Sequence, residues 1–269
     1  MSYIIIGTTG NFSRQLQQLI PEHKRLMIGK EIFETWNESP KIRALESKEY
    51  QIQKGDYLIN TIGITSPNYS LESLRRVNLE FPKYLYHLSK KFELNLVTLG
   101  SVHENYPDLF LHNNYMIVKK ELKLFLEENS YANSFHFQFH TWYGGTRLKK
   151  EMFLGQIITA LRNNSIFLMS SGKQIREYHH IEDDALCLLD VLNYANFGRQ
   201  VVTHGNPLTL QEIAFHIFSY FDKTHLLRFG LNNSQFDDLY SITVLEPIKT
   251  QCSFRSTLDG IIKYVEYNL

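Results

Sequence analysis

Short apolar runs that alternate with amphipathic stretches constrain the fold of this chain more than any other feature. Each run is bounded by residues that favour turns, and the intervening stretches at 70–91 and 115–129 place their apolar residues at helical spacing. Apolar strands that alternate with amphipathic helices are typical of a parallel sheet covered on both faces. The pattern therefore predicts an α/β fold with a doubly wound parallel sheet. The runs are "YIIIG", "RLMI", "DYLINTIG", "LNLVTLGS" and "SFHFQFHTWYGG".

The pattern changes after about residue 145. Helices are predicted at 151–164, 183–195 and 209–221, and Thr209 with Glu212 matches a capping box at the start of the last one. The helix at 183–195 is expected to be capped by Glu182, Asp183 or Asp184. We expect a first domain at 1–145 to which 177–203 returns, and a smaller C-terminal lobe formed by 146–176 and 204–269.

The composition excludes several classes of protein. Lys plus Arg and Asp plus Glu both total 28, so no net charge attracts nucleic acid or an anionic membrane. No apolar run approaches the roughly 18 residues of a membrane helix, and the start "MSYIIIGTTG" has neither a charged leader nor a cleavage site. Cys187 and Cys252 are far apart and match no metal-binding spacing, so neither a disulfide framework nor a zinc site is predicted. We expect a cytoplasmic protein.

A turn with two glycines joins the first predicted strand to the first predicted helix. In "IIIGTTGNFSRQL", Gly7 and Gly10 stand where backbone N–H groups at a helix N-terminus bind a dinucleotide pyrophosphate. Ser13 occupies the third glycine position of the pattern. A tight strand-to-helix turn without a ligand would also explain two glycines. Their place at the start of an α/β chain favours cofactor binding.

The residues after the second predicted strand bear on the choice of cofactor. An acidic residue there would bond the ribose 2′-hydroxyl of NAD and repel a 2′-phosphate. "RLMIGKE" instead offers Lys30, with Glu31 just beyond it, and Arg14 is a second candidate partner for a phosphate. The sequence thus favours NADP over NAD.

The order of motifs along the chain resembles that of a known family. Gly-x-x-Gly is followed by "INTIG", Asn78 within a helix, "LVTLGS", Tyr-x-x-x-Lys and "REYHHIEDD". This order resembles the extended short-chain dehydrogenase/reductase family, and more narrowly its NAD-dependent epimerase/dehydratase branch, which acts on nucleotide sugars. Three Tyr-x-x-x-Lys matches compete for the role of the active pair: Tyr115 with Lys119, Tyr50 with Lys54, and Tyr86 with Lys90.

The resemblance assigns roles around the serine strand. The active pair of the family follows the strand that ends in serine, which here selects Tyr115 and Lys119. Tyr115 would transfer the substrate proton, and Ser101 would donate a hydrogen bond to the reacting oxygen. Lys119 would bond the nicotinamide ribose, and a cation within about 6 Å should lower the pKa of the tyrosine toward neutrality. His103 stands where 4,6-dehydratases carry an acid, which disfavours dehydration; it is either a second acid or a residue that bonds a loop carbonyl.

Two further segments resemble the substrate side of the family. In "FQFHTWYGG" His140 replaces a family asparagine and is a candidate substrate contact, and in "GKQIREYHHIEDD" Arg176 would bond the diphosphate of the nucleotide sugar. His179 and His180 are adjacent on an extended chain and point to opposite faces, so this doublet predicts no metal site.

The predicted function is NAD(P)-dependent reduction of a 4-keto nucleotide sugar used for surface polysaccharide. It would be carried out by a Rossmann-like sheet with a C-terminal substrate-binding lobe. The missing dehydratase acid and the preference for NADP favour net reduction. Epimerisation at C4 with tightly bound NAD is one alternative, and dinucleotide binding without catalysis is another. The resemblance also implies a homodimer.

Overall fold

The structure is a computed structural model in which residues 1–29, 36, 52–66, 69–106, 113–146, 148–230 and 246–269 are described. The chain forms two compact units. Unit 1 consists of Met1–Phe139 and Leu192–Val201, and unit 2 consists of His140–Val191 and Val202–Leu269. The returning segment is therefore shorter than the predicted 177–203.

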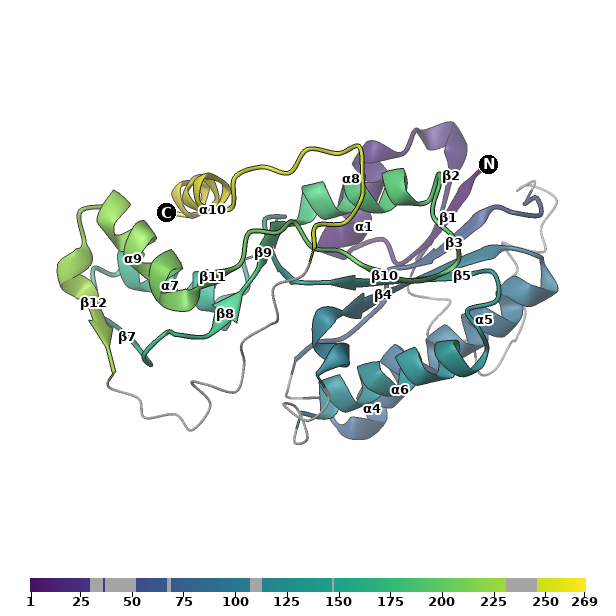
Figure 1. The fold of residues 1–269 in the computed structure, drawn as a ribbon, viewed down its shortest axis with the longest axis horizontal. Helices are drawn as coiled ribbons and strands as arrows, with labels where there is room; N and C mark the ends of the chain where they lie inside the picture. Colours follow the sequence, from purple (N-terminus) through teal and green to yellow (C-terminus); the bar gives the residue numbers. More distant parts are fainter. Residues whose placement is uncertain (30–35, 37–51, 67–68, 107–112, 147, 231–245) are drawn as a thin grey trace. The chain divides into compact units, whose positions relative to one another are not determined.

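A six-stranded sheet in which every pair of neighbours is parallel forms the centre of unit 1 (Figure 1). The spatial order is β10-β5-β4-β3-β1-β2, so the direction of strand addition reverses at β1. The predicted doubly wound parallel sheet is confirmed. Ligands of such sheets bind outside the carboxyl ends of the strands at the reversal point. The strands are β1 (Tyr3–Ile6), β2 (Arg25–Ile28), β3 (Tyr57–Asn60), β4 (Asn95–Ser101), β5 (Ser134–Phe139) and β10 (Gly198–Val201).

Helices of unit 1 lie on both faces of its sheet, with α1 on one face and α4, α5 and α6 on the other (Figure 1). Apolar residues of the strands, such as Ile4 and Leu96, pack with Leu85 of α5 and Leu122 of α6 in one buried core. This core holds the carboxyl ends of the strands in place. The helices are α1 (Asn11–Leu19), η1 (Glu22–Lys24), α4 (Leu71–Arg75), α5 (Phe81–Lys91), η3 (Val102–Asn105) and α6 (Asn114–Glu128).

A π-helical turn, η2 (Arg76–Glu80), joins α4 to α5, so the helix predicted at 70–91 runs through a local widening. Asn78 is buried within this turn. Its Oδ1 accepts from the backbone N–H of Ile64 at 3.1 Å, and its Nδ2 donates to the Ile64 carbonyl at 2.8 Å. The side chain thereby anchors the segment that follows β3. Such turns are frequent at functional sites.

In its described residues, unit 2 combines short strand pairs with four longer helices. β6 pairs in parallel with β9, β7 pairs in parallel with β12, and β8 pairs antiparallel with β11. Ile157 of α7, Ile213 of α9 and Ile261 of α10 are fully buried in a second apolar core. The elements are β6 (Thr141–Tyr143), α7 (Phe153–Arg162), β7 (Phe167–Met169), β8 (Ile175–Arg176), β9 (Tyr178–His180), α8 (Ile181–Val191), β11 (Leu208–Thr209), α9 (Leu210–Tyr220), η5 (Thr224–Leu226), β12 (Leu227–Phe229) and α10 (Thr257–Tyr267).

Two predictions about helix starts have opposite outcomes. The capping box of α9 is confirmed, because the hydroxyl of Thr209 accepts from the backbone N–H of Glu212 at 3.1 Å, and the Glu212 carboxylate accepts in return. The predicted cap of α8 is wrong, because the helix begins at Ile181 and Glu182, Asp183 and Asp184 lie in its first turn.

Two global features of the described residues complete the fold. None of their helices has the length and apolar character needed to cross a membrane. Cys187 and Cys252 are both free thiols.

Candidate functional site

The segment between β1 and α1 lies where the strand order reverses. Gly7 has a φ of +96°, and a Cβ at this position would lie 2.7 Å from Thr61 Oγ1, so only glycine fits without strain. Thr61 follows β3, and its hydroxyl donates to the carbonyl of Ile6 at 2.7 Å. The loops that follow β1 and β3 are therefore in contact at the carboxyl ends of their strands.

The N-terminus of α1 has the features of a phosphate site. Gly10 is the N-cap residue, and no side chain caps this end of the helix. The first N–H groups of the helix and its dipole can therefore bind an anion. Ser13 is buried, and its hydroxyl donates to the Gly10 carbonyl at 3.0 Å, while Arg14 lies half-buried in the same turn. These residues fit a dinucleotide pyrophosphate. Lys30, the other predicted phosphate partner, lies outside the described residues.

Ser101 ends β4 and caps the short helix η3. Its Oγ accepts from the backbone N–H of His103 at 3.3 Å and lies 3.1 Å from His103 Nδ1. The carboxylate of Glu104 accepts from the backbone N–H of Ser101 at 2.8 Å, which completes a capping box. The turn itself therefore holds the serine hydroxyl and the His103 imidazole together.

Helix α6 carries Tyr115 and Lys119 on successive turns. Asn113 caps this helix by accepting from the backbone N–H of Met116 at 3.2 Å. Lys119 Nζ lies 5.9 Å from the centroid of the Tyr115 ring and donates to the carbonyl of Leu99 at 2.5 Å. Because Leu99 belongs to β4, this bond ties α6 to the strand that ends at Ser101. The fold thus brings together β4 and α6, the two elements that carry the predicted catalytic residues.

The electrostatics of this pair differ from the sequence-based expectation. Burial, and then the negative charge of Glu104, raise the pKa of Tyr115 well above its ordinary value. Burial lowers the pKa of Lys119, although Glu104 opposes that shift. The predicted lowering of the tyrosine pKa is therefore wrong for the protein alone, because burial and the charge of Glu104 both disfavour the phenolate. Tyr115 is a protonated phenol at neutral pH.

A buried polar network behind Ser101 was not predicted. His136 Nε2 lies 2.8 Å from Glu104 Oε2, and His136 Nδ1 lies 2.8 Å from the hydroxyl of Thr98. Gln138 Nε2 also donates to Glu104 Oε2, at 2.9 Å. Although burial raises the pKa of Glu104, the charge and hydrogen bond of His136 bring it below its ordinary value. Glu104 is therefore an ionised carboxylate that is only 2% exposed.

Of the two competing Tyr-x-x-x-Lys matches, only Tyr86 with Lys90 lies wholly within the described residues. Tyr86 is fully buried in the core of unit 1, with Lys90 Nζ 4.7 Å from its ring centroid. Tyr50 lies outside the described residues. The packing of Tyr86 in the core therefore argues against that match, and the choice of Tyr115 stays a prediction from motif order.

The two predicted substrate contacts belong to unit 2. Arg176 is half-buried in β8, and its guanidinium donates to the Ile175 carbonyl at 2.8 Å. The side chain of His140 is only 2% exposed and faces Glu177, with 3.4 Å between His140 Nε2 and Glu177 Oε2. The imidazole of His140 therefore lies in the interior of unit 2, and its role as a substrate contact stays a prediction.

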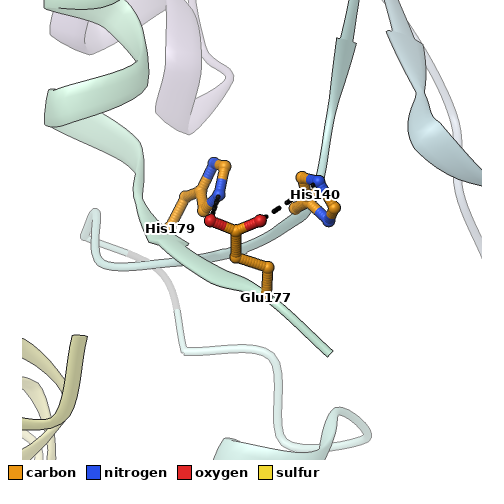
Figure 2. Close-up of side chains that lie close together, drawn as sticks. All are labelled: His140, Glu177 and His179. Carbon is orange, nitrogen blue, oxygen red and sulfur yellow. Dashed lines mark ion pairs between the residues drawn. The ribbon is translucent and has the colours of Figure 1, made fainter. Parts of the chain in front are cut away.

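His140 is part of a buried cluster of imidazoles and carboxylates in unit 2 (Figure 2). His179 stacks on His204 with 3.5 Å between the ring centroids. Burial alone would lower the pKa of His179. The charge and hydrogen bond of Asp184, and the hydrogen bond and charge of Glu177, instead raise that pKa to about 9. His180 instead packs against the ring of Tyr143. Only one member of the histidine doublet therefore joins the cluster.

Comparisons with known proteins give a clear result at the level of structure. No family model and no curated protein matches the sequence. Solved structures match 99% of this chain. A UDP-N-acetylglucosamine 4-epimerase from Methanobrevibacter ruminantium M1 in complex with UDP-N-acetylmuramic acid has 14% identity, a TM-score of 0.74 and 97% of its own chain covered.

Two enzymes from Bacillus anthracis match in the same way. A dTDP-4-dehydrorhamnose reductase in complex with NADP has 15% identity, a TM-score of 0.73 and 100% of its chain covered. A dTDP-glucose 4,6-dehydratase in complex with NAD has 13% identity, a TM-score of 0.69 and 96% of its chain covered. The chain has the same fold as these solved enzymes. The family resemblance of the sequence is thus confirmed for the fold, over nearly the whole chain.

Proposed function

We propose that the protein is an NAD(P)-dependent enzyme that reduces a 4-keto nucleotide sugar. The observation that carries this proposal is the arrangement of Ser101, Tyr115 and Lys119 on β4 and α6, in a unit whose glycine loop lies at the reversal point of the sheet. One similar structure is a 4-dehydrosugar reductase with NADP. The chemistry of these side chains matches what such a reaction requires.

Each residue has a definite task in the proposed reaction. NAD(P)H supplies the hydride that is added to the keto carbon. Ser101 donates a hydrogen bond to the carbonyl oxygen, and Tyr115 transfers its phenolic proton to that oxygen as negative charge develops there. The developing phenolate is stabilised by the ammonium of Lys119. Arg176 is proposed to bond the diphosphate. His103, 3.1 Å from Ser101 Oγ, is positioned to share the serine proton.

Two observations favour reduction over the other reactions of similar structures. Tyr115 starts as a protonated phenol, since burial raises its pKa. A proton donor is what reduction needs, whereas epimerisation begins with removal of a hydroxyl proton. Dehydration needs an acid near Ser101, and Glu104 cannot supply it because it is ionised, buried and bonded to His136. From the family resemblance, we further infer a cytoplasmic homodimer whose product serves surface polysaccharide synthesis.

Absorbance of NADPH and NADH tests the proposal. The purified protein is mixed with 4-keto sugars generated in place on CDP, GDP, UDP and dTDP. Consumption with one carrier is expected, and Tyr115→Phe should lower kcat by about 10²–10⁴-fold while it leaves NADPH affinity unchanged. Tyr86→Phe is the matched control, because the Tyr86 hydroxyl is buried and has no hydrogen-bond partner among the described residues; full turnover is expected.

Other outcomes would overturn the proposal. A new sugar isomer without NAD(P)H consumption would make the protein an epimerase, an activity that one similar structure has. Binding of NADPH without any turnover would make it a dinucleotide-binding protein. Equal turnover in Tyr115→Phe and the unaltered protein would exclude Tyr115 as the donor.

A further inference from the structure

Three buried side chains of unit 2 converge on one point. His140 follows β5, and Glu177 and His179 come from the segment of β8 and β9. Glu177 Oε2 lies 3.4 Å from His140 Nε2, and Glu177 Oε1 lies 3.3 Å from His179 Nε2. The three side chains are 0–2% exposed. Figure 2 shows the carboxylate between the two rings.

These separations fit the shell of a metal ion better than a pair of hydrogen bonds. An N–H···O bond has its most frequent length at about 2.9–3.0 Å. A tetrahedral zinc ion with ligands at about 2.0–2.1 Å keeps neighbouring ligand atoms about 3.3–3.4 Å apart. One ligand atom from each of the three residues lies within 4.8 Å of the others. Each histidine nitrogen therefore lies at a zinc-like spacing from one carboxylate oxygen of Glu177, and all three residues are near enough to share one ion.

The surroundings of the cluster resemble the outer shell of such a site. A histidine that binds a metal usually donates its other N–H to a carboxylate. His179 Nδ1 lies 3.0 Å from both carboxylate oxygens of Asp184, which also accepts from Trp142 Nε1 at 2.5 Å. The Glu177 carboxylate is held by the hydroxyl of Thr203 at 2.7 Å and by the backbone N–H of His204 at 2.6 Å. These hydrogen bonds thus fix the orientation of His179 and Glu177.

The charges of the cluster also favour a bound cation. Glu177 and Asp184 are two buried carboxylates that contact the two ring nitrogens of His179. A buried charge without a compensating partner is costly. A divalent cation with neutral imidazoles would balance both.

We propose that His140 Nε2, His179 Nε2 and the carboxylate of Glu177 bind one Zn²⁺ ion in unit 2. Two imidazoles and one carboxylate are ligands that zinc accepts readily. Because the side chains are buried, the ion is structural: it joins the chain before β6 to β9 and stabilises their pairing. The triad of His179, Asp184 and His204 is not the primary site, because its contacts of 2.9–3.0 Å are hydrogen-bond distances.

Metal content of the full-length, tag-free protein tests this proposal. The protein is incubated with ZnCl₂, desalted and analysed by inductively coupled plasma mass spectrometry. About one zinc per chain is expected. His140→Gln and Glu177→Gln should each lose most of the zinc. His180→Gln is the matched control, since this neighbouring imidazole packs against Tyr143 outside the cluster, and it should retain the ion. Cys252→Ser should also retain it.

The outcomes separate the possibilities. Zinc below about a tenth of an equivalent in the unaltered protein, retention by both ligand variants, or loss from Cys252→Ser would each overturn the proposal. Circular dichroism checks that the variants fold. If they do not, the unaltered protein loaded with Co²⁺ decides: ligand-field bands of a tetrahedral site without thiolate charge transfer support the proposal, and an octahedral or thiolate spectrum refutes it. None of these readouts depends on enzymatic turnover.

Discussion

Replacement of Glu104 by glutamine should destabilise unit 1 strongly, although the side chain keeps its shape. The two carboxylate oxygens accept on opposite sides: Oε1 from the backbone N–H of Ser101 at 2.8 Å, and Oε2 from Gln138 Nε2 at 2.9 Å. A glutamine has only one acceptor atom, so its NH₂ group must face one of these two donors. The variant also removes the negative charge that lies 2.8 Å from His136 Nε2.

The magnitude follows from the burial of the pair. An unsatisfied buried donor costs about 1–3 kcal/mol, and more when the lost partner carried a charge. We therefore expect Glu104→Gln to lower the free energy of unfolding by about 1–3 kcal/mol, a sizeable part of the roughly 5–15 kcal/mol of a typical domain.

Urea denaturation followed by tryptophan fluorescence measures the effect. The chain has two tryptophans, and Trp36 packs against Phe81 in unit 1. A Trp142→Phe background therefore makes the signal specific to this unit. Glu128→Gln is the control, because Glu128 is exposed at the end of α6, and a change within about 0.5 kcal/mol is expected there. A loss below about 1 kcal/mol for Glu104→Gln, with an unchanged m value, would refute the importance of the buried pair.

Three further predictions concern the same fold. The stability advantage of the unaltered protein over Glu104→Gln should be full above about pH 4.5 and shrink as the pH falls below it, because the pKa of Glu104 is lowered by folding; acid titrations of both proteins check this. Gly7→Ala should weaken NADPH binding, measured by nucleotide fluorescence, by about tenfold or more, whereas Gly55→Ala, with a similar φ of +86° and open space around it, should not. Thr209→Ala should destabilise unit 2 by about 1 kcal/mol in thermal melts, while Thr224→Ala, at an exposed position, should have little effect.

The layers of the fold were predictable because their signals are local. The β-branched run at Tyr3–Ile6 indicates a buried strand, and the spacing of apolar residues in Asn11–Leu19 indicates a helix with one buried face. The capping box of α9 spans only four residues, from Thr209 to Glu212. Such features depend little on the rest of the chain, so a single sequence reveals them.

Boundaries that distant contacts decide were not predictable. Helix α8 starts earlier than expected, at Ile181. Its first-turn Asp183 binds the side chain of Arg255, with 2.9 Å between Asp183 Oδ1 and the guanidinium Nε, and no local pattern indicates that partner. The same contact helps to explain why α8 belongs to unit 2 and why only Leu192–Val201 returns to unit 1.

The candidate site also has a part that local sequence indicates and a part that distant contacts decide. Ser101, Tyr115 and Lys119 could be proposed as site residues from motif order, but the charges around them could not be predicted, because Glu104 and His136 lie far apart in the sequence. A signal was nevertheless present in "SFHFQF": every residue of β5 is buried, and a buried imidazole must find a partner. The glycine of "LVTLGS" leaves room for these side chains, since a Cβ on Gly100 would lie 2.4 Å from His136 Nε2 and 2.8 Å from Glu104 Oε1. Polar residues inside an apolar strand, next to a strand that ends in Gly-Ser, therefore point to a charge buried beneath the serine.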